Sequence, residues 1–202
     1  METAVAKHTD DAGAKMGMWL FLFTEMLFFG GMFLLYAVYS TKYSADFSGA
    51  SAELNMIIGA CNTVILITSS FTAALSLSEI KKGALRSASA SLGITALLGI
   101  IFLIIKYTEW SAKIGHGIYP GSAYFNDISH GKVLFYSLYF VMTGIHALHV
   151  LIGILVFAVI LFMIYGGSIH EGDFIKLENA ALYWHFVDIA WIYLFPLLYL
   201  LR

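Results

Sequence analysis

Several ionisable side chains stand inside long apolar stretches of this 202-residue sequence. The ones nearest the middle of such stretches are Glu25, His146, His149, His185 and Asp188. An ionisable group near the centre of a bilayer costs about 2.5–3.5 kcal/mol on insertion scales, so its presence indicates bonding, proton handling or ligand binding. His146 and His149 share one helix face at a spacing of three residues, and so do His185 and Asp188. Glu178, seven residues before His185, is nearly in line with the second pair.

These residue types support three kinds of site. The first is a structural network that joins helices, because interhelical polar bonds contribute about 0.6–2 kcal/mol each. The second is a proton-handling or ligand site. The third is a haem held by a histidine from each of two helices, His146 or His149 with His185. We hypothesise that Glu25 hydrogen-bonds across helices to one of these histidines, because a buried charge is tolerated when it is paired.

Motifs for other chemistries are absent from the sequence. Di-iron carboxylate sites use Glu-x-x-His on two helices, and neither copy occurs in the apolar stretches. The zinc motif HExxH, the dinucleotide motif GxGxxG and the P-loop are also missing. Cys61 is the single cysteine, which excludes an internal disulfide and a cysteine-built zinc site. We therefore predict no catalytic residue and no metal ligand in this chain.

The apolar stretches predict an all-α fold, an integral membrane bundle of five transmembrane helices. The composition is 60% hydrophobic and only 12% charged, whereas soluble domains carry about 25% charged residues. A helix needs about 20 apolar residues to cross a bilayer, and the runs are continuous, unlike the alternating strands of a barrel. The expected spans are approximately 17–39, 54–77, 87–107, 134–165 and 178–201. Residues 1–16 form a polar N-terminal segment that lacks the features of a signal peptide.

Alternation of these spans brings the ionisable residues to one level. At 1.5 Å per residue, Glu25, His146, His185 and Asp188 lie about 10–16 Å from the face where the first span begins. The hydroxyl groups of residues 68–70 fall at a similar level. We therefore predict a polar layer built from four helices, whichever face of the membrane is cytoplasmic.

Charged residues near the ends of the spans indicate orientation and surface contacts. The basic cluster of Lys81, Lys82 and Arg86 favours a cytoplasmic N-terminus and an outer C-terminus. Lys106 and Glu109, three residues apart near the end of the third span, are expected to form an interfacial ion pair. The net charge of −2, without a basic patch, argues against a nucleic-acid partner.

Five ordered motifs resemble subunit III of the haem-copper terminal oxidases. They are WLFLFTEMLFFGGMFLLY (19–36), NTVILITSSFTAALS (62–76), KYTEW (106–110), YFVMTGIHALHVLIG (139–153) and ENAALYWHFVDIAWIYLFPLLYL (178–200). In the first, Glu25 matches the family's membrane-embedded glutamate before paired phenylalanines. The strongest single match is YWHFVDIAW at 183–191.

This resemblance implies an accessory subunit without haem or copper of its own, set in a bacterial inner membrane. Such a subunit packs against catalytic subunit I, which reduces dioxygen to water and pumps protons, and against other oxidase subunits. It is thought to stabilise the catalytic subunit and support proton uptake. The embedded polar residues are associated with internal hydrogen bonding and bound phospholipid. Carried over by motif, they are Glu25, His146, His149, Glu178, His185 and Asp188.

One departure from the family and three other functions stay open. The longest family members have seven helices, and this chain lacks counterparts of the first two, as five-helix bacterial forms do. The alternatives are a haem-b anchor or electron-transfer subunit, a small transporter or proton channel, and a subunit-III-like protein linked to nitric oxide reductase. The sequence shows no broken helices and no inverted repeats, which argues against the transporter alternative. The sequence leaves open the electron donor, cytochrome c or quinol, and membership of a supercomplex.

Overall fold

Five long helices and two short ones make up the chain, seen in a computed structural model that describes residues 2–122 and 124–201. The five that are long and apolar enough to span a membrane are α1 (Glu2–Lys42), α3 (Met56–Lys81), α4 (Leu85–Gly115), α6 (His130–Tyr165) and α7 (Ile175–Phe195). The short helices are α2 (Ser44–Ala52) and α5 (Tyr124–Asp127), and a π-helical turn, η1 (Pro196–Leu200), continues α7. No strand occurs among the described residues. The predicted all-α fold with five spans is confirmed.

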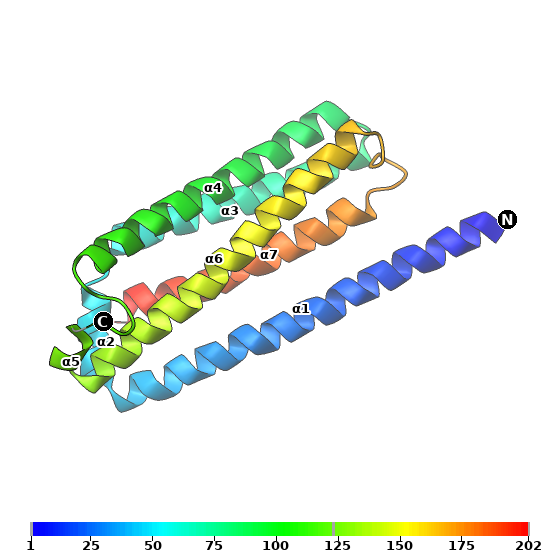
Figure 1. The fold of residues 1–202 in the computed structure, drawn as a ribbon. Coiled ribbons are helices and arrows are strands. Elements are labelled where there is room, and N and C mark those ends of the chain that lie inside the picture. Colours follow the sequence, from blue (N-terminus) through cyan, green and yellow to red (C-terminus); the bar gives the residue numbers. More distant parts are fainter. Residues whose placement is uncertain (1, 123, 202) are drawn as a thin grey trace.

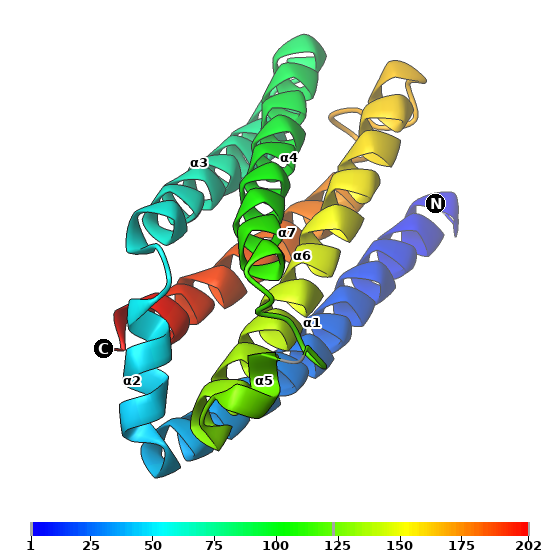
Figure 2. The same cartoon turned by 60° about the vertical axis from the view of Figure 1, so that its left-hand side comes forward.

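Successive long helices run in opposite directions, so the two ends of the chain lie at opposite ends of the bundle (Figure 1). Helices α3 and α4 lie side by side along one edge, α6 and α7 lie in the middle, and α1 flanks them on the other side (Figures 1 and 2). Helix α7 is the best covered span, with 50% of its most apolar stretch buried, and α1 the least, with 11%. This arrangement makes α7 the centre of the fold and leaves α1 largely facing outward.

Helix α1 is continuous through the segment that we expected to precede the first span. It includes residues 2–16 and ends at Lys42, just before Tyr43 leaves the helical conformation. Helix α2 then crosses the end of the bundle and holds the C-terminal turn, because the Ser51 hydroxyl donates to the Leu198 carbonyl at 2.8 Å. The Tyr36 hydroxyl of α1 donates to the neighbouring Leu197 carbonyl at 2.6 Å. These bonds use carbonyls at the C-terminal end of a helix, which lack partners within it.

Glycines make room for the tryptophan at the centre of the bundle. Trp184 of α7 is fully buried and donates its indole N–H to the Ser69 hydroxyl of α3 at 3.0 Å. A Cβ atom on Gly153 of α6 would lie 2.6 Å from the Trp184 ring, and one on Gly99 of α4 would lie 2.8 Å from it. Small residues let helix backbones approach closely in membranes, so these two positions set how tightly α4 and α6 pack on α7.

Candidate functional site

A carboxyl and an imidazole meet where α1 crosses α6. Glu25 Oε2 lies 3.1 Å from His149 Nε2, and both side chains are mostly buried, 19% and 13% exposed. Phe29 packs edge-on against the His149 ring with centroids 5.3 Å apart, and its own side chain is 2% exposed. The Tyr183 hydroxyl donates to the His149 backbone carbonyl at 3.0 Å. Aromatic groups from α1 and α7 therefore enclose the pair.

The hydrogen bonds of His149 fix how many protons the pair holds. His149 Nδ1 lies 2.8 Å from the Ile145 carbonyl, which can only accept, so Nδ1 carries a proton. The bond between Nε2 and Glu25 then needs one further proton, on the carboxyl or on Nε2. In either form the pair has no net charge, which suits a site that is shielded from water. The geometry thus describes one hydrogen bond between α1 and α6.

His146 does not reach Glu25, although it lies one turn from His149. Its ring is fully buried, with its centroid 5.5 Å from Phe102 and 5.1 Å from Trp191. Neither ring nitrogen has a hydrogen-bond partner within the described part of the chain. Of the three histidines that we considered as partners of Glu25, His149 is therefore the one in contact, and His146 packs into the bundle centre.

His185 of α7 and Ser70 of α3 form a second polar group. Ser70 Oγ lies 2.6 Å from His185 Nδ1. Asp188, one turn further along α7, is 3% exposed and close to Ser70, yet neither carboxyl oxygen has a partner in hydrogen-bonding geometry among residues 2–122 and 124–201. The polar layer predicted from depth is thus divided into separate groups, Glu25 with His149 and Ser70 with His185.

Glu178 belongs to neither group. Its carboxylate lies 3.0 Å from Lys15 Nζ of α1, and the next residue, Asn179, donates to the Ala14 carbonyl at 3.4 Å. Glu178 stands in the first turn of α7, where a negative charge interacts favourably with the helix dipole. These contacts fasten the first turn of α7 to α1 near the end of the bundle.

Lys106 and Glu109 form the predicted ion pair at 2.8 Å, but protein encloses it. Their side chains are only 2% and 5% exposed. Lys106 also donates to the Tyr199 hydroxyl at 2.6 Å, and the Tyr199 and Tyr139 hydroxyls lie 2.7 and 2.9 Å from Glu109 Oε1. The Trp191 ring lies under the ammonium group at 5.0 Å. The pair is enclosed by protein because the C-terminal turn folds Tyr199 back over it.

A polar contact that the sequence did not predict joins α6 to the connection between α2 and α3. Lys132 Nζ lies 2.8 Å from Glu53 Oε1, and the Tyr136 hydroxyl donates to Glu53 Oε2. Burial alone would raise the pKa of the Glu53 carboxyl, but these two hydrogen bonds and the charges of Lys132 and Lys113 lower it below its usual value. Glu53 is therefore an ionised anchor at this end of the bundle.

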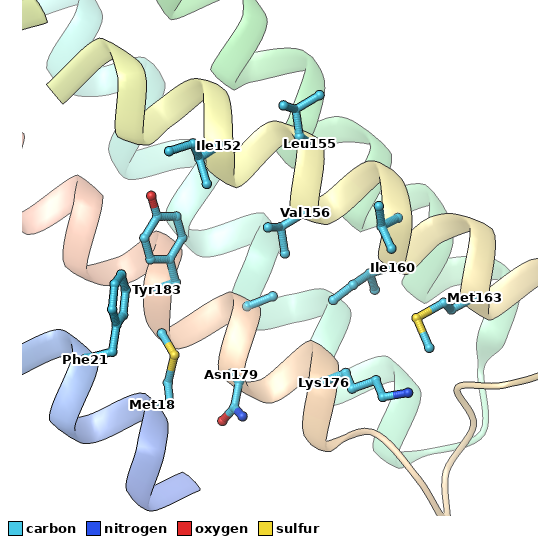
Figure 3. A pocket seen from close by; sticks show the side chains of 12 residues that line it. Met18, Phe21, Ile152, Leu155, Val156, Ile160, Met163, Lys176, Asn179 and Tyr183 are labelled. Atoms are coloured by element: carbon cyan, nitrogen blue, oxygen red, sulfur yellow. The ribbon is translucent and has the colours of Figure 1, made fainter. Parts of the chain in front are cut away.

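An apolar cleft of about 640 Å³ opens between α1, α6 and α7. Figure 3 shows side chains of the three helices converging on it, among them Met18, Val156 and Tyr183. Lys176 lies at one end, beside the loop that joins α6 to α7 (Figure 3). The cleft is suited to a long apolar ligand with an anionic group at that end.

Known proteins match this chain over almost its whole length. The family described as cytochrome c oxidase subunit III matches residues 2–201. The cytochrome bo(3) ubiquinol oxidase subunit 3 of Pseudomonas aeruginosa is 32% identical over 197 residues, which cover 96% of this chain and 88% of the relative. The cytochrome c oxidase subunit 3 of Thermostichus vulcanus is 33% identical over 191 residues, 92% and 86% of the two chains. That of Rhipicephalus sanguineus is 34% identical over 198 residues, 93% and 70%.

Proposed function

The chain belongs to the cytochrome c oxidase subunit III family, and we propose that it acts as the accessory third subunit of a haem-copper terminal oxidase. In this role it packs against the catalytic subunit, stabilises it and supports its proton uptake. The observation that supports the proposal within the structure is the Glu25–His149 pair, a hydrogen bond between two spans. It occupies the position of the glutamate that the sequence motif shares with the family.

The pair fastens the least buried span to the bundle. Helix α1 is tied at one end by Lys15 and Glu178, and at the other end by the bond from Tyr36 to the Leu197 carbonyl. The Glu25–His149 contact is the bond between side chains that holds its middle. A span that is only 11% buried relies on such ties to keep its position. We infer that the pair keeps α1 in the position that the catalytic subunit recognises.

The histidines give little support to a haem in this chain. His149 uses both ring nitrogens in contacts with Ile145 and Glu25, and His185 uses one with Ser70. The His146 ring packs against both Phe102 and Trp191, whereas an axial ligand would need space for a macrocycle beside it. These contacts favour the accessory subunit over the alternative of a haem-b anchor.

We further propose that the cleft of Figure 3 binds a phospholipid. Its walls are apolar side chains of α1, α6 and α7, and Lys176 lies at the end where the headgroup would be. Replacing Val156 with Trp should fill the cleft and lower the amount of lipid that co-purifies with the complex, measured by mass spectrometry. Leu148→Trp, on an exposed part of α6, is the matched control. Equal lipid content in the two variants would contradict the assignment.

We assign the N-terminus to the cytoplasm and the C-terminus to the outer side of a bacterial inner membrane. Lys81, Lys82 and Arg86 lie at the turn between α3 and α4, at the end of the bundle where α1 begins (Figure 1). Clusters of Lys and Arg are retained on the cytoplasmic side. A membrane-impermeant thiol reagent tests this assignment: it should label Ser87→Cys only in inverted vesicles.

Turnover lifetime tests the accessory role. The purified oxidase with the chain present should sustain oxygen consumption longer than the same oxidase stripped of it, and adding the chain back should restore the lifetime. Glu25→Ala should weaken retention of the chain, because it removes the tie on α1. Equal lifetimes with and without the chain, at equal haem content, would contradict a stabilising role.

A further inference from the structure

A second groove lies between α1 and α7, apart from the cleft of Figure 3. It has a volume of about 310 Å³. The residues that line it are Trp19, Leu22, Phe23, Met26, Leu182, His185, Phe186 and Ile189. His185 is the one titratable side chain among them. It lies ten residues into α7, about 15 Å along the helix axis and so near the middle of a bilayer about 30 Å thick.

The His185 ring can offer a hydrogen bond to a molecule in this groove. Its Nδ1 is within 2.6 Å of the Ser70 hydroxyl, and no hydrogen bond of its Nε2 occurs among the described residues. When Ser70 donates its proton to Nδ1, the ring proton is on Nε2. Imidazole Nε2–H then becomes a donor on the wall of an otherwise apolar groove. Small-molecule sites combine such apolar walls with a few placed polar groups.

The depth of the groove in the membrane limits which kind of molecule can bind in it. A phospholipid headgroup is charged and stays at the membrane surface, so it does not reach a donor at mid-membrane depth. Trp19, Met26 and Ile189 are each more than half exposed to the surroundings, so a molecule dissolved in the bilayer can enter from the side. The rings of Trp19, Phe23 and Phe186 can stack on a flat ring.

We propose that this groove binds the head group of an isoprenoid quinone. One ring carbonyl accepts a hydrogen bond from His185 Nε2, the quinone ring packs among the aromatic side chains, and the isoprenoid tail lies along the outward face of α1. The site binds the quinone without transferring electrons. It goes beyond the accessory role, because it would hold a membrane-soluble molecule on the third subunit.

The test uses the purified oxidase complex and a photoreactive azido-quinone with a short isoprenoid tail. Illumination should label peptides of α1 and α7, and excess unlabelled short-tail quinone should prevent this. His185→Phe keeps the ring and removes the donor, so the affinity read from the labelling curve should fall about two- to tenfold. Leu182→Trp adds bulk at a residue that lines the groove and keeps Ser70 and His185 in the sequence, so it should abolish the labelling.

A substitution away from the groove and equal recovery of the chain serve as controls. Leu148→Trp, on an exposed part of α6, should label as the unmodified chain does, and all variants are compared at equal recovery of the chain in the complex. The proposal would be overturned if α1 and α7 of the Leu182→Trp variant were labelled as strongly as those of the unmodified chain. Displacement of the probe by added phospholipid and not by quinone would also overturn it, because this would mark the groove as an ordinary lipid contact. Labelling confined to other subunits would overturn it as well.

Discussion

Glu25 of α1 and His149 of α6 are hydrogen-bonded across the boundary between two membrane spans, with Oε2 and Nε2 3.1 Å apart. The adjacent residues do not make this contact. His146 is one turn away on the same helix but packs against Phe102 and Trp191. Removing Glu25 should therefore change the effect of a His149 substitution on stability, but not the effect of a His146 substitution.

A double-mutant cycle should detect the bond between Glu25 and His149. We expect Glu25→Ala and His149→Phe each to lower thermal stability of the solubilised complex, and their combination to cost about 0.6–2 kcal/mol less than the sum, because both remove one bond. Glu25→Ala combined with His146→Phe is the matched control and should be additive. Additivity in both cycles would contradict the contact.

The buried ion pair of Lys106 and Glu109 should be sensitive to the loss of one partner. Glu109→Gln leaves the Lys106 ammonium buried without a carboxylate, which costs about 3–5 kcal/mol. The double variant Lys106→Met with Glu109→Gln should recover part of this loss, because no uncompensated charge is left. Thermal unfolding of the complex measures both. If Glu109→Gln had the same melting temperature as the unmodified protein, the pair would not be enclosed as described.

Acidification should remove the contribution of Glu53. Its pKa in the folded chain is below the usual value of 4.5, so its contribution to stability is full above that value and is lost as the pH falls through the lowered pKa. The melting temperature of the unmodified protein should therefore exceed that of Glu53→Gln at neutral pH, and the difference should shrink in acid. Salt should reduce it too, because Glu53 is 40% exposed. A difference that grows in acid would contradict the sign.

Close packing on Trp184 predicts opposite results for two glycines. Gly153→Ala would place a methyl group 2.6 Å from the Trp184 ring, and overpacking of this kind costs about 1–3 kcal/mol. Gly31→Ala meets nothing within 4 Å, so it should be neutral or slightly stabilising through better helix propensity. Equal melting temperatures of the two variants would show that α6 can move away from α7 at no cost.

The five spans could be predicted from the sequence because run length and hydropathy alone determine them. The short helix α2 could not, because its nine residues carry no apolar run and owe their place to contacts such as that of Ser51 with the Leu198 carbonyl. No pattern among the polar residues 2–16 indicated that α1 continues back through them. Where a helix begins depends on local hydrogen bonding, which hydropathy does not report.

The candidate site was predictable in its residue types but not in its pairing. His146 and His149 share a helix face, so their spacing could not say which meets Glu25; the rotation of α6 decides this, because Phe102 and Trp191 surround His146. Tyr139 and Tyr199 stand in apolar runs where tyrosine is common. Nothing local indicated that their hydroxyls close over Lys106 and Glu109. Such contacts join residues up to 93 positions apart and arise only from the assembled bundle.

We propose that this chain is an accessory oxidase subunit that carries no haem of its own, and the visible redox spectrum of the purified chain tests this role. The chain is purified from its native membranes in mild detergent, and the spectrum and subunit masses are recorded before and after its partners are stripped away. We expect a haem-copper spectrum that leaves with a large partner, while the isolated chain absorbs no visible light. A haem that stays with the isolated chain and vanishes in His185→Ala would contradict the account and identify an electron-transfer anchor.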